Sequence, residues 1–255
     1  MGAVSIEVAD GVGLIRLDRP PANAIDHETG LELQEVIRAA GGDDAVGAIV
    51  VWGGPRIFAA GADIAAMAGY SPEEIRPVVS ALGDALDLLE ALPKVSIAAI
   101  NGYALGGGFE LALAADLRYL AEDGIVGQPE IKLGVIPGAG GTQRLTRLAG
   151  PGVAADLVYS GRRVGAAEAL GLGLVQRVSP ADEVLPTALA HAGALAHGPR
   201  TALAAAKASI RTALAAAPAD GLAEEKDRFC ALFGTPDQRE GMRAFLDKRE
   251  PRFGS

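Results

Sequence analysis

The spacing of hydrophobic positions changes along the chain. The opening VSIEVADGVGLIRLD has two alternating segments around Asp10 and Gly11, which is a strong signal for a β-hairpin. Helical spacing follows over residues 27–40 and returns over 72–92. The short apolar runs AIVVWGG and VSIAAING are typical of strands buried in a parallel sheet. Strand, glycine loop and helix recur without the full alternation of a barrel, so we predict a layered α/β architecture with glycine loops along one edge.

The pattern becomes almost wholly helical from about residue 180 onward. Breaks are expected near Gly198-Pro199 and near Pro218, because glycine and proline end helices. Exposed charges in this region alternate with three aromatic positions, Phe229, Phe233 and Phe245. We expect a helical appendage that covers its own core or lies on a neighbouring subunit.

Composition narrows the class of protein. The chain has 255 residues, of which 49% are hydrophobic and 22% charged, so it can bury a large core. It shows no basic leader and no apolar run of membrane-spanning length, so we expect neither export nor membrane insertion. Its single cysteine, Cys230, cannot form an internal disulfide, and no paired Cys/His spacing predicts a metal site, so a reducing cytoplasm fits best. The formal net charge of -9 argues against nucleic acid as the main partner.

Two glutamates are candidates for acid/base chemistry. Glu110 ends the segment ALGGGFE and Glu130 ends VGQPE, and both segments carry glycines that let backbone approach a ligand. The glycines at 106–108 open a predicted helix, whose first N–H groups lack intrahelical partners and can bind an oxyanion. The same letters also fit an ordinary strand-to-helix turn, and most carboxylates in a chain with 32 acidic residues lie on the surface.

Other phosphate-binding and nucleophile motifs are absent from the letters. A GxGxxG motif would need glycine at positions 111 or 143, which are Leu111 and Gln143. Neither GxxxxGK[ST] nor GxSxG occurs. The three histidines, at positions 27, 191 and 197, lie away from the glycine loops in the sequence and are interpreted as surface or capping residues.

Five segments together resemble the enoyl-CoA hydratase/isomerase, or crotonase, superfamily. They are FAAGADI (58–64), NGYALGGGFELALAAD (101–116), GQPEIKLGVIPGAGGTQRL (127–145), SGRRVGAAEALGLGLVQRV (160–178) and REGMRAFLDKR (239–249). The resemblance covers nearly the whole chain. It implies a ClpP-like α/β spiral of repeated ββα units over residues 1–195, followed by a helical trimerisation region over 196–255. It also implies a homotrimer or homohexamer.

The resemblance assigns roles to four of these positions. The backbone N–H groups of Ala62 and Gly107 would hold the thioester oxygen of an acyl-CoA, where charge develops during reaction. Glu110 would position and deprotonate water, and Glu130 would deliver a proton to Cα. Because glutamate stands at both positions, we expect an enoyl-CoA hydratase of the fatty acid β-oxidation type, which adds water reversibly and syn to a trans-2-enoyl-CoA. CoA is then part of the substrate, and no other cofactor and no metal is expected.

Three alternatives remain at this stage. A 3,2-trans-enoyl-CoA isomerase needs a proton shuttle alone, and another acyl-CoA-transforming crotonase would share the same site. A noncatalytic RNA-binding or scaffold member is less favoured by the charge of -9.

Further residues are implied by the resemblance to bind CoA or to support the glutamates. Binding to CoA is expected from Arg56, Ala60, Ile64, Phe245 and Lys248, with the last two reaching a neighbouring subunit. Gln128 and Gly138 are expected to orient a carboxylate or water. Ala65 stands where many family members have a lysine, which removes one expected phosphate contact. Residues 65–75 and parts of the tail are expected to form the wall of the acyl pocket.

Overall fold

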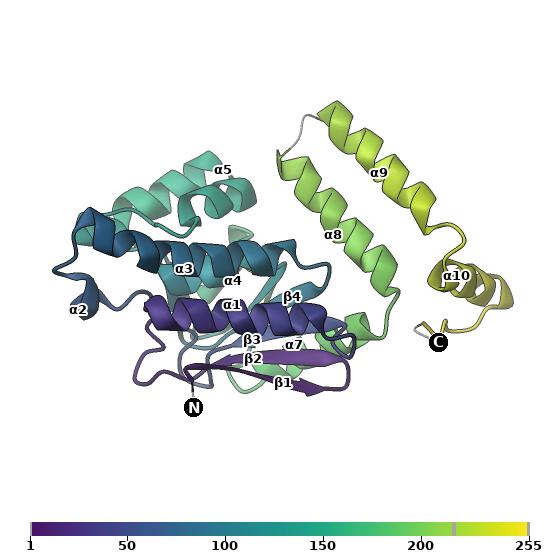
Figure 1. Ribbon diagram of the computed structural model, residues 1–255, viewed down its shortest axis with the longest axis horizontal. Coiled ribbons are helices and arrows are strands. Elements are labelled where there is room, and N and C mark those ends of the chain that lie inside the picture. The colour runs from purple at the N-terminus through teal and green to yellow at the C-terminus, as the bar shows by residue number, and fades with distance from the viewer. Residues whose placement is uncertain (1, 216–217, 254–255) are drawn as a thin grey trace.

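The computed structural model describes residues 2–215 and 218–253, and its centre is a six-stranded sheet (Figure 1). The strands of this sheet, in chain order, are β1 (Val4–Ala9), β2 (Val12–Leu17), β3 (Ala48–Trp52), β4 (Val95–Ile100), β6 (Leu117–Ala121) and β9 (Arg177–Ser179). Their spatial order is β1-β2-β3-β4-β6-β9. The β1–β2 pair is antiparallel, and every later pair is parallel.

The predicted hairpin at the start of the chain is confirmed. Val4 pairs with Leu17 and Ala9 pairs with Val12, which leaves Asp10 and Gly11 as a two-residue turn. Both turn residues have positive φ, 49° at Asp10 and 75° at Gly11. Positive φ at both positions matches the twist of the flanking strands, and an Asp-Gly pair adopts it readily.

A second, three-stranded sheet builds the repeated units. It consists of β5 (Tyr103–Leu105), β7 (Ile125–Gly127) and β8 (Arg163–Gly165), with β5 parallel to β7 and β7 antiparallel to β8. The chain passes from β4 in the main sheet to β5 in the second sheet and then into a helix. It repeats this path from β6 to β7. The predicted ββα units are therefore present, and each glycine loop follows a strand as the sequence indicated.

Helices cover both faces of the main sheet (Figure 1). Their bounds are α1 His27–Gly42, α2 Ile64–Met67, α3 Pro72–Ala91, α4 Gly107–Ala114, the 3-10 turn η1 Glu130–Leu133, α5 Gly141–Ser160, α6 Ala166–Gly171, α7 Val184–Ala196, α8 Arg200–Ala215, α9 Pro218–Leu232 and α10 Pro236–Asp247. Alternate strand residues point to opposite faces, so Ile49 and Val51 join the core under α1 and α3, whereas Ala48 and Val50 pack with α7. This two-sided burial explains why β3 and β4 are almost wholly apolar.

Side-chain caps explain where α1 and α3 begin. The Asp26 carboxylate accepts a hydrogen bond from the Thr29 N–H at 2.9 Å and starts α1. At α3, Ser71 and Glu74 form a reciprocal capping box, in which the Ser71 N–H donates to the Glu74 carboxylate at 2.7 Å. Both starts agree with the predicted ranges.

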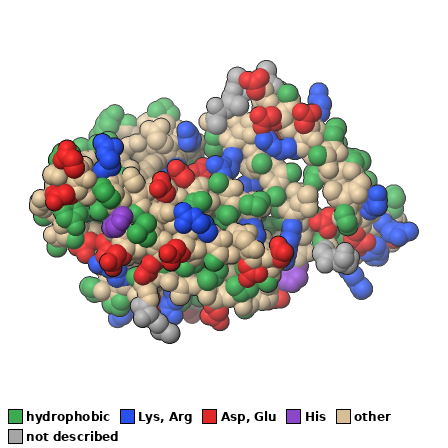
Figure 2. Space-filling model, in the orientation of Figure 1, with side chains coloured by type: hydrophobic (Ala, Val, Ile, Leu, Met, Phe, Trp, Pro, Cys, Tyr) green, Lys and Arg blue, Asp and Glu red, His purple; other side chains and the backbone are tan. Residues whose placement is uncertain are grey.

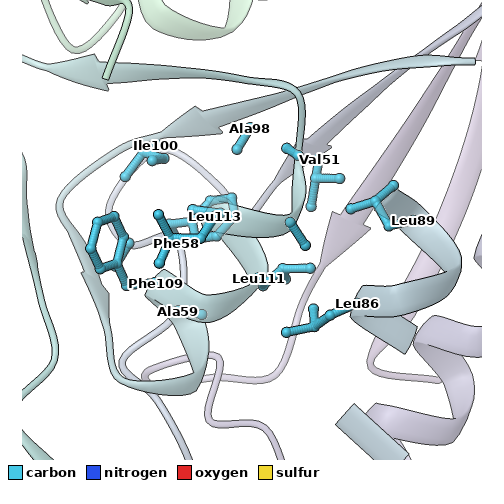
Figure 3. Packing of buried hydrophobic residues seen from close by; sticks show 14 of the residues in the cluster. Val51, Phe58, Ala59, Leu86, Leu89, Ala98, Ile100, Phe109, Leu111 and Leu113 are labelled. Atoms are coloured by element: carbon cyan, nitrogen blue, oxygen red, sulfur yellow. The ribbon is translucent and has the colours of Figure 1, made fainter. Parts of the chain in front are cut away.

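The short helix α4 is buried along its whole length. Its apolar residues Phe109, Leu111 and Leu113 pack with Phe58 and with β4 in the main core (Figure 3). A helix that is apolar on every side is held in place by its surroundings. Glu110 is the one charged residue in α4, so packing of the core fixes its position.

The last three helices lie to one side of the layered part of the chain (Figure 1). α8 packs beside α9, and α10 follows at the far end. The breaks predicted near residues 198–199 and 218 are confirmed, because α7 ends at Ala196 and α9 begins at Pro218. The division between residues 195 and 196 falls at the last turn of α7 and stays a prediction.

None of the helices in the described ranges is long and apolar enough to cross a bilayer.

Candidate active site

Two glycine turns lie side by side at the edge of the second sheet. The Leu105 N–H donates to the Ala59 carbonyl at 3.1 Å, which joins the segment after β3 to the end of β5. Gly61 has a φ of 107°, and a Cβ placed on it would lie 2.9 Å from the Leu105 carbonyl oxygen. Gly106 has a φ of 52° and forms the turn into α4. Glycine is required at both positions because the backbone conformation and the close approach exclude a side chain.

This approach brings the N–H groups of Ala62 and Gly107 together. A Cβ placed on Gly107 would lie 3.9 Å from the Ala62 nitrogen. Gly107 is the first residue of α4, so its N–H has no intrahelical acceptor. The Ala62 N–H also has no hydrogen-bond acceptor among the described residues. Two such donors beside each other can bind one oxygen atom that carries negative charge.

Ala62 and Gly107 both line a cavity of about 470 Å³. Glu110 and Glu130 are the two polar side chains among the described residues that form its wall. The remaining lining residues are glycine, alanine, proline and larger apolar residues. The cavity therefore combines a small polar end with an apolar wall, as small-molecule sites commonly do.

Glu110 is 3% exposed and is held by the backbone of the loop before α5. Its Oε1 accepts hydrogen bonds from the N–H groups of Ala139, at 2.8 Å, and Gly141, at 2.7 Å. Burial raises the pKa of Glu110, while these two N–H groups and the charge of Arg144 act in the opposite direction. The other carboxylate oxygen of Glu110, Oε2, lies near the turn at Gly106–Gly107, 3.9 Å from the position that a Cβ on Gly107 would occupy.

Glu130 begins η1 and approaches the same turn from the other side. Its Oε1 lies 3.0 Å from the position that a Cβ on Gly106 would occupy. Burial raises the pKa of Glu130 to about 7, and the neighbouring charge of Glu110 adds to this effect. Gln128 is fully buried, and when its side-chain nitrogen faces Glu130 it donates to Oε1 at 2.9 Å and Oε2 at 3.2 Å.

Burial raises the pKa of both carboxyl groups, and at Glu110 the two N–H groups and Arg144 partly oppose this effect. When Glu110 is ionised, it can accept a proton. A pKa of about 7 lets Glu130 carry a proton near neutral pH and release it. With the two N–H donors lining the same cavity, the arrangement can add or move protons on a substrate whose carbonyl oxygen gains negative charge.

The structure brings several other predicted residues to this cavity. Ala60, Ile64 and Gly138 line it, as do Met67, Ala68 and Ile75 from the segment predicted to form its wall. The side-chain amide of Gln128 contacts the carboxyl group of Glu130. Larger wall residues from α3, Val78, Val79 and Leu82, lie outside the predicted wall segment. Their helical spacing marks them only as core residues, so the sequence gives no signal that they face a ligand.

Three predicted CoA-binding residues lie away from the cavity of their own chain. Arg56 is exposed in the loop that follows β3 and is not part of the cavity lining. Phe245 is 83% exposed on α10, and Lys248 directly follows that helix, which lies at the opposite end of the molecule from α2 (Figure 1). Binding by Phe245 and Lys248 to the ligand of a neighbouring subunit stays a prediction.

Comparison with known proteins agrees with this geometry. Residues 7–255 match the family model described as enoyl-CoA hydratase/isomerase. A protein of Mycobacterium leprae described as a probable enoyl-CoA hydratase is 44% identical over 95% of this chain and 94% of its own. Crotonyl-CoA hydratase of Syntrophomonas wolfei is 40% identical over 98% of this chain and 97% of its own.

A solved structure shows the same likeness. The crystal structure of an enoyl-CoA hydratase from Bacillus anthracis superposes with a TM-score of 0.94 at 38% identity, over 99% of each chain. The crotonase spiral expected from the sequence is therefore confirmed. This chain belongs to the enoyl-CoA hydratase/isomerase family.

Proposed function

We propose that this protein is an enoyl-CoA hydratase, which adds water reversibly to a trans-2-enoyl-CoA and forms the 3-hydroxyacyl-CoA. One observation supports this most strongly: Glu110 and Glu130 line the same cavity as Ala62 and Gly107, whose N–H groups have no acceptor among the described residues. Relatives named enoyl-CoA and crotonyl-CoA hydratase support the same reaction. Fatty acid β-oxidation is the pathway type that we propose for it, and a cytoplasmic location stays a prediction.

The oxyanion donors would act on the thioester. As the water oxygen bonds to Cβ, the π electrons of the double bond move through the carbonyl and place negative charge on its oxygen. The Ala62 and Gly107 N–H groups stabilise that enolate without reorganising, because the backbone already holds them in place. Removal of one such donor typically costs about 3 kcal/mol of transition-state stabilisation.

The glutamates would move the protons. Glu110 takes a proton from water as the new C–O bond forms, and Glu130 gives its proton to Cα as the enolate collapses. The product gains OH at Cβ and H at Cα, and the two carboxyl groups exchange protonation states. Syn addition, which the resemblance to the family implies, stays a prediction and requires both glutamates to act on the same face of the double bond. Solvent exchange then restores the starting protonation.

The apolar wall indicates a plain hydrocarbon acyl group. No polar side chain among the described residues lines the cavity apart from Glu110 and Glu130. A hydroxyl or carboxylate on the acyl tail would therefore be buried without a hydrogen-bond partner, at a cost of roughly 1–3 kcal/mol or more. We propose that the tail lies along α3, from Leu82 toward Ile75.

We also propose a homotrimer or homohexamer in which α10 completes the CoA site of a neighbouring subunit. Large apolar side chains of the last helices support this, because Leu222, Phe229 and Phe245 are 66%, 60% and 83% exposed. Exposed apolar surface of this kind marks an interface. Phe245 and Lys248 would then contact CoA across the interface, and Arg56 would contact it within the chain. Sedimentation as a stable monomer would contradict this assembly.

The runner-up reaction is double-bond migration in a 3-enoyl-CoA. It requires one proton to leave Cα and one to arrive at Cγ, and Glu130 with a pKa of about 7 is suited to such a shuttle. RNA binding has less support, because acidic and basic side chains are interspersed on the face in Figure 2 and the net charge is -9.

Separate substrates distinguish the two reactions. Hydration of a trans-2-enoyl-CoA removes the absorbance of the conjugated thioester, whereas isomerisation of a trans-3-enoyl-CoA creates it. We expect fast loss of absorbance with the first substrate and a much slower gain with the second. The opposite ranking of kcat/KM would favour the isomerase.

A further inference from the structure

Arg144, in the first turn of α5, is connected to Glu110 through a single residue. Its Nη1 donates to the Ala139 carbonyl oxygen at 2.8 Å, and the Ala139 N–H donates to Glu110 Oε1 at 2.8 Å. We propose that Arg144 is a positioning residue for Glu110, which fixes the loop whose N–H groups hold the carboxylate. Its consequence for turnover rests on the proposed function.

The loop that binds Glu110 has no polar side chain of its own to fix it. It reads Gly138-Ala139-Gly140-Gly141, and Gly140 has a φ of 100°. Three glycines in four residues have much conformational freedom, so their ordered state needs contacts from outside the loop. Arg144 provides one, because its Nη1 lies 2.3 Å from where a Cβ on Gly140 would be and so packs directly against the turn.

Arg144 is itself fixed by two carboxylates of α3. Its Nε donates to Glu90 Oε2 at 2.9 Å and its Nη2 donates to Asp87 Oδ1 at 2.5 Å. These residues are three positions apart, so they share one face of the helix. The Arg144 side chain is 9% exposed, whereas its partners Glu90 and Asp87 are 27% and 76% exposed, so the guanidinium is buried and the Asp87 end of the cluster faces water. A planar guanidinium can bind the loop and both carboxylates at once, and an ammonium cannot.

The same residue bears on the charge of the site. The charged groups that face Glu110 are Glu130 from η1 and Arg144 from α5, and Asp87 and Glu90 from α3 face Arg144. Burial raises the pKa of Glu110, and the charge of Arg144 and the two loop N–H groups lower it. Loss of Arg144 would remove the charge and loosen the N–H groups, so both effects raise this pKa.

Arg147 is a matched control on the same helix. It lies three residues after Arg144, is exposed, and forms no ion pair among the described residues. Arg147→Met therefore changes the same charge and side-chain type on α5 without touching the loop. If the role of Arg144 were merely structural, Arg144→Met would lower the stability of the protein. The pKa of Glu110 would then be the same in Arg144→Met and in Arg147→Met.

The test is a carbon-13 NMR titration of the glutamate side-chain carboxyls in the full-length protein. The Glu110 signal is assigned by its absence in Glu110→Gln. We expect Arg144→Met to raise the pKa of Glu110 relative to Arg147→Met. If Arg144→Met does not fold, Arg144→Lys replaces it in the test. We expect Arg144→Lys to raise the pKa of Glu110 as well, because one ammonium group cannot bind the loop and α3 at the same time. Equal Glu110 pKa values in the Arg144 and Arg147 variants would overturn the proposal.

Kinetics with crotonyl-CoA then separate this proposal from the proposed function. We expect kcat to fall on the order of 10²-fold in Arg144→Met, as for other displacements of a catalytic group, with a smaller change in KM. Arg147→Met should match the wild type. An inactive wild-type enzyme would refute the hydratase reaction and leave the NMR result to decide the role of Arg144. Wild-type kcat in Arg144→Met would overturn positioning.

Discussion

The carboxyl groups of Glu110 and Glu130 face one cavity from two different elements, α4 and η1, and are held by different partners. Glu110 accepts hydrogen bonds from backbone N–H groups, whereas Glu130 faces the side-chain amide of Gln128. Burial raises the pKa of both groups, but the N–H groups and Arg144 oppose this effect at Glu110, whereas the charge of Glu110 adds to it at Glu130. This difference supports opposite proton-transfer roles for the two residues.

The pH profile should report that difference. Hydration requires Glu110 to be ionised and Glu130 to be protonated, so kcat/KM should fall as pH rises through about 7, the pKa of Glu130. At the acid side it should fall as Glu110 becomes protonated. Initial rates of crotonyl-CoA hydration from pH 5 to 9 check this. A hydration rate that stays constant from pH 6 to 9 would exclude Glu130 as the proton donor.

Stability should depend on pH through the same residue. The pKa of Glu130 is raised from 4.5 to about 7 on folding, so its contribution is fully present below 4.5 and is lost as pH rises through 7. Glu130→Gln removes this titration. We therefore compare the unfolding free energy of the variant with that of the wild type at pH 5 and at pH 8. The difference, variant minus wild type, should be larger at pH 8 than at pH 5 by on the order of 1 kcal/mol, after allowance for the partial exposure of Glu130.

Urea unfolding at both pH values measures this change, with the exposed Glu7→Gln as control. The control should show no such difference. If Glu130→Gln followed the wild type at both pH values, the raised pKa of Glu130 would be wrong.

Alanine should lower stability and activity at Gly61 much more than at Gly69. Alanine at Gly61 would have to keep a φ of 107° and place its Cβ 2.9 Å from the Leu105 carbonyl oxygen. Such strain costs roughly 1–3 kcal/mol and displaces the Ala62 N–H, so both Tm and kcat should fall. Gly69 has nothing within 4 Å of its Cβ position, and Gly69→Ala should keep both. Thermal unfolding and hydration rates of the two variants compare them, and equal behaviour would contradict the role of the Gly61 turn.

Acyl-chain preference should change with position along α3. A Leu82 methyl lies 3.1 Å from the Cβ position of Gly107, whereas Ile75 lies seven residues earlier, about 10 Å along the helix. We expect Ile75→Asn to lower kcat/KM for long acyl chains by roughly 10-fold or more and to spare crotonyl-CoA, because it places an unpaired amide on the distal wall. Leu82→Ala should affect every chain length.

A substrate series from four to sixteen carbons measures both profiles. A uniform loss across the series in Ile75→Asn would show that the tail does not run along α3.

The sequence predicts the elements of this fold well where local rules decide them. The Asp10-Gly11 turn, the caps of α1 and α3, and the apolar runs of β3 and β4 each carry their own signal. Glu110, Glu130 and the glycines at 106–108 are candidates from their own segments, but their roles and the pairing of Ala62 with Gly107 come from the resemblance, which links motifs that are distant in the chain. Spacing alone could not show that residues 59–62 and 105–107 meet.

Other parts of the site depend on tertiary packing and leave no local signal. Arg144 is one of many arginines in the sequence. The role that we propose for it depends on its hydrogen bonds to the Ala139 carbonyl and to two carboxylates on α3, which only the folded chain brings together. Leu82 has the spacing of a core residue. Phe245 and Lys248 would reach the ligand of a second chain, so one chain cannot bring them to a site.

Hydration of crotonyl-CoA by the wild type and by Glu110→Gln and Glu130→Gln is the most direct test of the central claim. Loss of the conjugated thioester absorbance gives kcat, and thermal unfolding verifies that each variant is folded. We predict rapid turnover by the wild type and a fall in kcat of roughly 10² to 10⁴-fold in each variant, as expected for loss of a general base or acid. Folded variants with the wild-type kcat would contradict the assignment of Glu110 and Glu130 as the catalytic pair.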